Sequence, residues 1–330
     1  MKSATYYKQQ AAKTAEKQKK IQDQVSKADK NSASKKKEKP MQAGARKYPE
    51  TPVARQHLTK PGLEKNMEVK PMYDAPYYKG SGKLQDMIAI ITGGDSGIGR
   101  SVAVLFAREG ADVAIVYLNE HPDAEETKKM VEEEGRSCIL IPGDVSDKNF
   151  CKLAVKKTID TFGKLNVLVN NAAFQLHVME FEDLTEEHFD TTIKTNLYGY
   201  FHMAHAAVPF MSYGSAIVNT GSVTGIMGNK DLLDYSLTKG GIHAFTRSLG
   251  THLIPKGIRV NAVAPGPVWT PLNPADKNKK AIAKFGGDTP MKRPAQPEEI
   301  APAYVFLASP QCSSYITGEI LPVIGGYSGG

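Results

Sequence analysis

The sequence contains little cysteine, with only Cys138, Cys151 and Cys312 among 330 residues. An odd number of cysteines without close spacing argues against a disulfide-stapled secreted domain and favours a reducing compartment. The N-terminus has no apolar signal core, and no apolar run approaches the roughly 20 residues that span a bilayer. We therefore expect a cytoplasmic protein that does not insert into membranes.

The sequence also has few side chains placed to hold a metal ion. His202 and His205 stand three residues apart, but no cysteine or carboxylate accompanies them at ligand spacing. We expect these histidines to pack against a helix or an interface. No metal site is predicted.

The positive charge is concentrated in one segment. Residues 1–40 carry twelve lysines against four carboxylates, whereas the whole chain has a net charge of +7, so the remainder is close to neutral. The segment has too few large apolar residues to offset the entropy of ordering it, which predicts a lysine-rich disordered tail over 1–40. Six prolines between 40 and 80 predict an extended arm over 41–82.

From Lys83 onward, short apolar runs alternate with stretches of helical length. The apolar runs, which predict buried strands, are residues 87–92, 112–117, 137–142, 165–170, 215–220, 258–264 and 319–324. Helices are predicted over 97–109, 122–134, 147–162, 186–211 and 234–255. This alternation predicts an α/β fold, a single Rossmann-like, doubly wound parallel-sheet domain over 83–330 behind the extended N-terminal arm.

Four glycines follow the first predicted strand within seven residues, in the sequence ITGGDSGIGR (91–100). In a strand–turn–helix unit, such glycines form the turn, admit a pyrophosphate to the backbone and let the helix pack against the strand. The spacing is not GxGxxG; it runs Thr92-Gly93-x-x-x-Gly97-x-Gly99. The glycines therefore suit a phosphate-binding turn, while a glycine-rich turn that simply joins a strand to a helix remains the alternative.

A tyrosine and a lysine form the candidate catalytic pair. Tyr235 and Lys239 are four residues apart in a predicted helix, so both side chains lie on one face. A free tyrosine titrates near 10, and a neighbouring ammonium is expected to lower that pKa. Ser222 lies just past the end of a predicted strand, at the sheet edge where ligands of parallel sheets gather.

Taken together, these motifs resemble the short-chain dehydrogenase/reductase family. The resemblance rests on TGxxxGxG (92–99), Asp144 in GDV, NNAA (170–173), the Ser222–Tyr235–Lys239 set and PGPVWT (265–270), in the family's order. It covers about residues 83–326. Stretches such as VAIVYLNEH and FTRSL are similar to a bacterial branch of general stress protein 39-like oxidoreductases, which implies a role in stress response.

The resemblance implies roles for particular residues. The implied catalytic residues are Tyr235, Lys239, Ser222 and Asn196, whose backbone carbonyl would hold a water in the proton path. The implied cofactor contacts at the glycine turn and after the next two strands are Gly93, Asp95, Ser96, Gly97, Ile98, Gly99, Tyr117, Asn119, Glu120, Asp144 and Val145. Those further along the chain are Asn171, Ala172, Ala173, Pro265, Gly266, Val268 and Thr270, with Tyr235 and Lys239.

The cofactor is expected to be NAD rather than NADP. Tyr117 and Ser96 occupy the positions where NADP-using relatives often carry a basic side chain, and Glu120 stands close enough in sequence to bond a ribose hydroxyl. NADP remains the alternative. Arg100 points to it only weakly, because a basic residue there is ordinary in a helix.

The leading hypothesis is an NAD(P)-dependent oxidoreductase that moves a hydride between nicotinamide and a small alcohol, aldehyde or ketone. By resemblance it would be a homotetramer, with residues 271–294 forming a mobile substrate lid that Trp269 and Phe285 could line. The alternative is a nucleotide-responsive binding protein whose basic tail docks on nucleic acid or an anionic surface. The tail contains no nucleic-acid-reading module, so nucleic acid is an unlikely partner. A further possibility is that residues 40–80 wrap a neighbouring subunit.

Overall fold

The structure is a computed structural model that describes residues 16, 19–20, 22–24, 27 and 39–326. Most of the predicted lysine-rich tail lies outside these described residues. Residues from Pro40 onward form one compact unit. Within the described residues, every helix is too short or too polar to cross a bilayer.

One seven-stranded sheet lies at the centre of this unit, and all its strand pairs are parallel. The strand order is β3-β2-β1-β4-β5-β6-β7. In register, Ile90 pairs with Ala114 on one side and Leu168 on the other. The strands are β1 (Ile88–Thr92), β2 (Asp112–Tyr117), β3 (Cys138–Pro142), β4 (Leu165–Asn170), β5 (Met211–Thr220), β6 (Arg259–Pro265) and β7 (Ile320–Val323).

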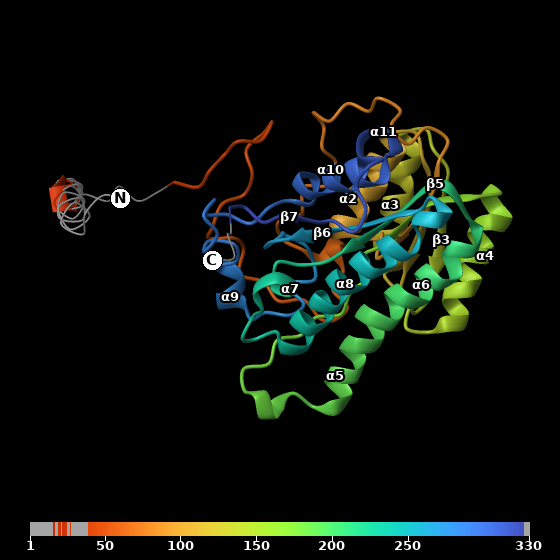
Figure 1. Cartoon of the computed structure of the whole chain (residues 1–330). Helices are drawn as coiled ribbons and strands as arrows, with labels where there is room; N and C mark the ends of the chain where they lie inside the picture. Colours follow the sequence, from red (N-terminus) through yellow and green to blue (C-terminus); the bar gives the residue numbers. More distant parts are fainter. Residues whose placement is uncertain (1–15, 17–18, 21, 25–26, 28–38, 327–330) are drawn as a thin grey trace, which may run out of the picture. The chain divides into compact units, whose positions relative to one another are not determined.

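Helices cover both faces of the sheet (Figure 1). One face carries α2 (Gly97–Arg108), α3 (His121–Glu133) and α10 (Pro297–Ala308), and the other carries α4 (Lys148–Phe162), α6 (Gly199–Ala207) and α8 (Leu233–His252). The remaining helices are α5 (Glu186–Ile193), α7 (Thr224–Met227), α9 (Lys279–Ala283), α11 (Pro310–Ser313), the π-helix η3 (Lys194–Tyr198) and the 3₁₀ turns η1 (Glu64–Asn66), η2 (Phe181–Asp183), η4 (Val208–Phe210) and η5 (Ile254–Lys256).

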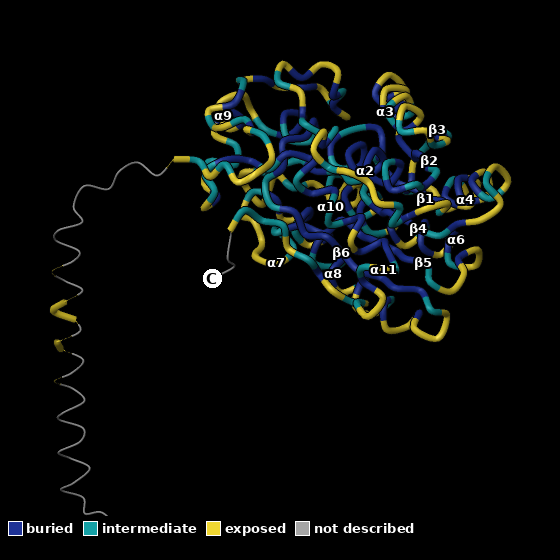
Figure 2. Tube along the Cα trace, turned by 90° about the horizontal axis from the view of Figure 1, so that it is seen from above, coloured by how far each residue is buried: buried dark blue, intermediate teal, exposed yellow. Residues whose placement is uncertain are grey.

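The sheet is buried on both faces, as its apolar runs predict. Every residue of β1 and β6 is buried, and Figure 2 shows the tube mostly dark blue around the β1, β4 and β6 labels and yellow toward the periphery. The predicted doubly wound α/β fold is confirmed. The chain order reverses between β1 and β4, and this switch point opens a crevice at the carboxyl ends of the strands.

The predicted helix over 186–211 is wrong in one respect, because the structure divides it. The helix starts as expected, where the Thr185 side chain accepts a hydrogen bond from the His188 amide. It then widens into the π-helical turn η3, which contains Asn196, before α6 continues. π-Helical turns of this kind occur mostly at functional sites.

The arm is extended and packs on its own subunit. Val53, Leu58 and Met67 of the arm form an apolar cluster with Trp269, Ala275 and Ile282, which belong to or adjoin the predicted lid. Backbone hydrogen bonds join Leu58 to Pro274 and Val53 to Ala283, and the Trp269 indole donates to the Val69 carbonyl at 2.9 Å. The lid therefore packs against the arm, where the sequence suggested a mobile segment.

The arm also reaches the glycine turn through Glu64. One carboxylate oxygen accepts the Gly97 amide at 2.7 Å, and the other lies 2.5 Å from Nη1 of Arg100. Asp123 on α3 accepts the Glu64 amide at 2.6 Å. Glu64, Arg100 and Asp123 are all buried, so Arg100 is a structural ion-pair partner. Removing one member of a buried ion pair leaves an uncompensated charge, which is costly.

Glu64→Ala tests this anchor. We expect a loss of about 3–5 kcal/mol in the free energy of unfolding, because buried Arg100 would lose its close carboxylate and keep only that of Asp123, 3.9 Å away. Chemical denaturation of the full chain measures it. Glu68→Ala is the control, since Glu68 is an exposed acidic residue of the same arm. Equal stability of the two variants would contradict the anchoring role.

Candidate active site

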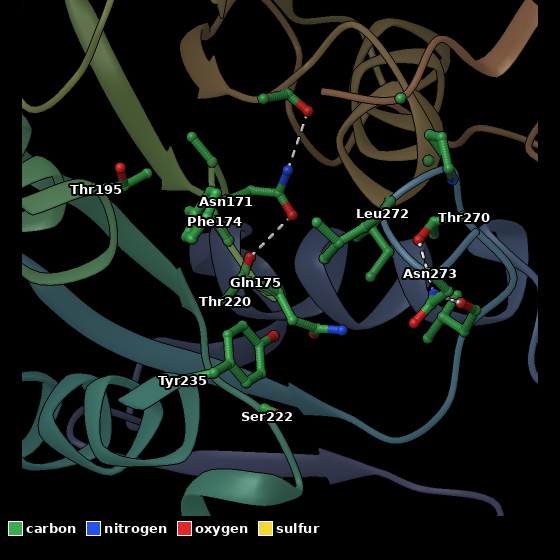
Figure 3. Close-up of a pocket in the computed structure, with 18 of the residues that line it drawn as sticks. Asn171, Phe174, Gln175, Thr195, Thr220, Ser222, Tyr235, Thr270, Leu272 and Asn273 are labelled. Carbon is green, nitrogen blue, oxygen red and sulfur yellow. Dashed lines mark hydrogen bonds between the residues drawn. The ribbon is translucent and has the colours of Figure 1, made fainter. Parts of the chain in front are cut away.

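A cavity of about 710 Å³ lies at the carboxyl ends of the strands, between the switch point and the lid (Figure 3). Most of the predicted site residues line it. They are Gly93, Asp95, Ser96, Gly97, Ile98, Tyr117, Glu120, Asp144, Val145, Asn171, Ala172, Ala173, Ser222, Tyr235, Lys239, Pro265, Gly266, Val268 and Thr270. Residues from six different strand ends thus meet at one place.

Three predicted site residues do not line the cavity. Gly99 is buried in the first turn of α2, and Asn119 is exposed at the surface. Asn196 is fully buried, and its neighbour Thr195 reaches the cavity in its place. Any part that Asn196 plays is therefore indirect.

Two glycines shape the turn where a nucleotide phosphate would rest. A Cβ atom on Gly99 would lie 2.0 Å from the Gly93 carbonyl oxygen, so only glycine lets α2 start this close to β1. Gly97 has a φ of +51°, which favours glycine, and a Cβ there would lie 2.9 Å from Thr270. Ile98 follows at the start of α2, where helix amides lack intrahelical partners and suit an anion. This cradle fits a dinucleotide.

Tyr235 and Lys239 lie together on α8, as their spacing predicts. The Lys239 ammonium is 5.3 Å from the centre of the Tyr235 ring, and it donates to the Thr220 carbonyl at 2.7 Å. Burial lowers the pKa of Lys239 to about 7. Burial likewise raises the pKa of the Tyr235 phenol above its usual value, and a hydrogen bond with Ser222 only partly opposes this. The sequence predicted that Lys239 would lower the pKa of Tyr235. In the described residues, without a cofactor, the pKa of Tyr235 is raised instead.

Ser222 lies in the loop after β5 and lines the cavity together with Tyr235 (Figure 3). Its hydroxyl oxygen accepts from the Thr224 amide at 3.1 Å and lies 3.0 Å from the Thr224 hydroxyl. Both contacts use the Ser222 oxygen as an acceptor, so its proton can be donated to the Tyr235 oxygen or to a substrate oxygen in its place. A hydroxyl held in this way can donate to a substrate oxygen.

Asn196 joins three elements around the site. Its side chain accepts from the Phe174 amide at 2.8 Å and donates to the Phe174 carbonyl at 2.9 Å. It also donates to the Thr238 hydroxyl at 3.1 Å. The loop after β4 is thereby tied to α8, one residue before Lys239.

Acidic side chains line the cavity after β1, β2 and β3. Asp95 and Glu120 are both buried, and burial together with the Glu120 charge raises the pKa of Asp95 to about 7. Glu120 accepts the Asn119 amide at 2.9 Å. Arg100 is held by Glu64, and no arginine is present among the described residues that line the cavity.

Several residues that line the cavity were not predicted from the sequence. They are Lys60 from the arm, Phe174 and Gln175 after β4, Thr191 and Thr195 near η3, and Leu272, Asn273 and Lys277 from the lid. None belongs to a motif, and only the position of 272–277 in the predicted lid gave a signal. Phe285 lines the cavity as suggested, whereas Trp269 is fully buried behind it at a ring distance of 6.4 Å.

Comparison with known proteins gives consistent matches. The family model described as enoyl-(acyl carrier protein) reductase matches residues 93–328. General stress protein 39 of Bacillus subtilis is 51% identical over 84% of this chain and 97% of its own length. The NADPH-dependent aldehyde reductase 1 of Arabidopsis thaliana is 47% identical over 82% of this chain and 96% of its length.

The fold has close counterparts among solved structures. A short-chain dehydrogenase from Burkholderia cenocepacia in complex with NADP superposes with a TM-score of 0.69 at 31% identity. The match covers 74% of this chain and 98% of that one.

A further relative by sequence is a glucose and ribitol dehydrogenase of Daucus carota, which is 47% identical over 81% of this chain and 94% of its own length.

Gly99→Ala tests the packing that forms the cradle. The added methyl group would collide with the Gly93 carbonyl, so α2 must shift and dinucleotide affinity should fall at least about tenfold. Calorimetric titration with NAD and NADP measures this. Gly240→Ala is the control, because a Cβ on this helical glycine would lie 3.6 Å from the Gly225 carbonyl oxygen, an ordinary contact, and should be stability-neutral or better. Unchanged affinity in Gly99→Ala would overturn the assignment.

Proposed function

The chain belongs to the short-chain dehydrogenase/reductase family, and from that premise we propose that it interconverts a small alcohol and the corresponding carbonyl compound. The observation that carries this proposal is the convergence of Tyr235, Ser222 and Lys239 on one cavity beside the glycine cradle. When bound, the nicotinamide cofactor supplies or accepts the hydride.

Tyr235 is the proton donor of the reductive direction. Because burial raises its pKa, the phenol keeps its proton at neutral pH, which is the form needed to protonate a carbonyl oxygen. Ser222 donates a hydrogen bond to the same oxygen while negative charge develops on it. In the oxidative direction Tyr235 acts in its phenolate form, which the Lys239 ammonium would stabilise, and it takes the proton of the substrate hydroxyl as the carbon loses its hydride.

Lys239 and Asn196 support Tyr235. The Lys239 ammonium, held by the Thr220 carbonyl, lies where a positive charge stabilises the phenolate once the site is filled and dry. Asn196 is a positioning residue, because its side chain fixes the loop after β4 against α8. The water held by its backbone carbonyl stays a prediction.

We also propose NAD as the preferred cofactor. The supporting observation is the acidic lining after β1–β3, where Asp95, Glu120 and Asp144 would repel a 2′-phosphate. The Arabidopsis relative is named an NADPH-dependent reductase, and the Burkholderia structure is a complex with NADP. The preference of this enzyme is therefore tested by measuring turnover with both cofactors. A homotetramer, a cytoplasmic location and a role in stress response likewise stay predictions.

Tyr235→Phe tests the proton transfer. We expect kcat to fall by about 10²–10⁴-fold, because the phenol oxygen is removed, while the Kd for the cofactor changes little. Nicotinamide absorbance over a panel of sugars, polyols, short alcohols and carbonyls gives the rates. Tyr213→Phe, a change at an exposed tyrosine, should behave as wild type. Wild-type turnover by Tyr235→Phe would defeat the mechanism.

Glu120→Gln tests the cofactor preference. Wild type should have the higher kcat/KM with NAD, and the variant should raise the NADP-to-NAD ratio about tenfold by removing one charge near the ribose. Glu133→Gln makes the same charge change at an exposed position near the other end of α3 and should leave the ratio unaltered. A wild-type preference for NADP would disprove the proposal.

A further inference from the structure

The arm contributes a cation to the substrate end of the cavity. Lys60, Pro61 and Gly62 form part of its wall, although they precede the sheet by more than twenty residues. The Lys60 ammonium donates to the Gln175 carbonyl at 2.5 Å and lies 5.4 Å from the centre of the Phe174 ring. Figure 3 shows Gln175 pointing into the same cavity as Tyr235.

The charges that line the cavity are divided between its two halves. The acidic residues Asp95, Glu120 and Asp144 follow β1, β2 and β3, which lie on one side of the switch point. The lysines lie on the other side: Lys239 on α8, Lys277 in the lid and Lys60 in the arm. Among the described lining residues, the half that holds Tyr235 and Ser222 contains three lysines and no carboxylate. This half would attract an anion.

The nearest buried carboxylate already has partners. One oxygen of Asp276 accepts from the Gln175 side chain at 2.6 Å, and the other accepts from the His177 amide at 2.7 Å and contacts the His177 ring nitrogen at 2.7 Å. Asp276 therefore braces the loop after β4 against the lid. Among the described residues, no carboxylate lies within ion-pair distance of the Lys60 ammonium.

Lys60 has donor capacity left for a ligand. An ammonium has three donors, and the Gln175 carbonyl accepts from one of them. The side chain is only partly buried and lines the cavity, so a ligand can reach the other donors. Burial lowers the pKa of Lys60 to about 8, and the more distant Asp276 charge only partly opposes that shift. A ligand anion beside the ammonium would offset the desolvation and accept the remaining protons.

We propose that Lys60 binds a carboxylate or phosphate group carried by the substrate, so that the N-terminal arm selects anionic alcohols and carbonyl compounds. The inference rests on the proposed function and adds a substrate class to it. Lys277 of the lid stands on the same half of the cavity and adds to the attraction. The competing explanation is that Lys60 only clamps the Gln175 carbonyl and has no contact with substrate.

Paired aldehydes separate these explanations in the full-length enzyme. Succinic semialdehyde is compared with butanal for the carboxylate, and glyceraldehyde 3-phosphate is compared with glyceraldehyde for the phosphate. We expect wild type to favour the charged member of at least one pair in kcat/KM. The pair that shows the preference identifies which anion is recognised.

Lys60→Met should lower kcat/KM for the charged member about tenfold or more, and change that for the neutral member less than about twofold. Lys60→Arg should restore most of the charged-substrate activity. Lys79→Met, at an exposed lysine of the same arm, is the matched control and should match wild type. An equal loss for both members in Lys60→Met, or no wild-type preference, overturns the proposal.

A binding measurement keeps this inference separate from the proposed function. If none of the aldehydes or panel compounds is turned over, the proposed function fails. Calorimetric titration with 2-phosphoglycolate, succinate and the neutral analogue ethylene glycol then decides the role of Lys60. Anion binding that weakens about tenfold in Lys60→Met but persists in Lys79→Met supports it. Equal affinity in both variants, or no anion binding by wild type, overturns it.

Discussion

The closeness of α2 to β1 is the constraint on which the site depends. The Gly93 carbonyl occupies the space that a side chain at Gly99 would need, so the helix begins directly above the end of its strand. That placement puts the start of α2 at the switch point between β1 and β4, where the Gly97 amide is bonded to Glu64 and the amides that follow it are placed for an anion. The loops after β4 and β5 then bring Asn171 and Ser222 to the opposite wall of the crevice.

The N-terminal arm adds three sets of contacts to this architecture. It contacts the glycine turn through Glu64, the lid through the apolar cluster around Trp269, and the cavity through Lys60. One continuous segment therefore spans both ends of the site. The position of the lid depends on packing against residues that lie far outside the family match, which begins at residue 93.

The fold could be predicted because its determinants are local. Runs such as 112–117 are apolar at every position but the first, and their alternation with helical stretches specifies a parallel sheet. The spacing of Tyr235 and Lys239 likewise fixes a shared helix face. The π-helical turn at 194–198 was missed, because nothing in KTNLY distinguishes it from an ordinary helix.

The rest of the site could not be predicted, for physical reasons. Glu64 and Lys60 are single charged residues in a proline-rich segment, and their importance arises from partners 33 and 115 residues away. The protonation of Tyr235 depends on how deeply tertiary packing buries it, which spacing does not reveal. Asn119 illustrates the converse error, because it lies within a motif-bearing stretch and still faces away from the cavity.

The hydrogen bond between Trp269 and Val69 has a consequence for the order of folding. Its partners are separated by 200 residues, and those of the Arg46–Glu298 ion pair by 252. During synthesis the arm emerges some 200 residues or more before Trp269 and Glu298, which receive it. These two contacts can therefore form only after most of the sheet has been made, and they belong to the late, slow part of folding that non-local contacts impose.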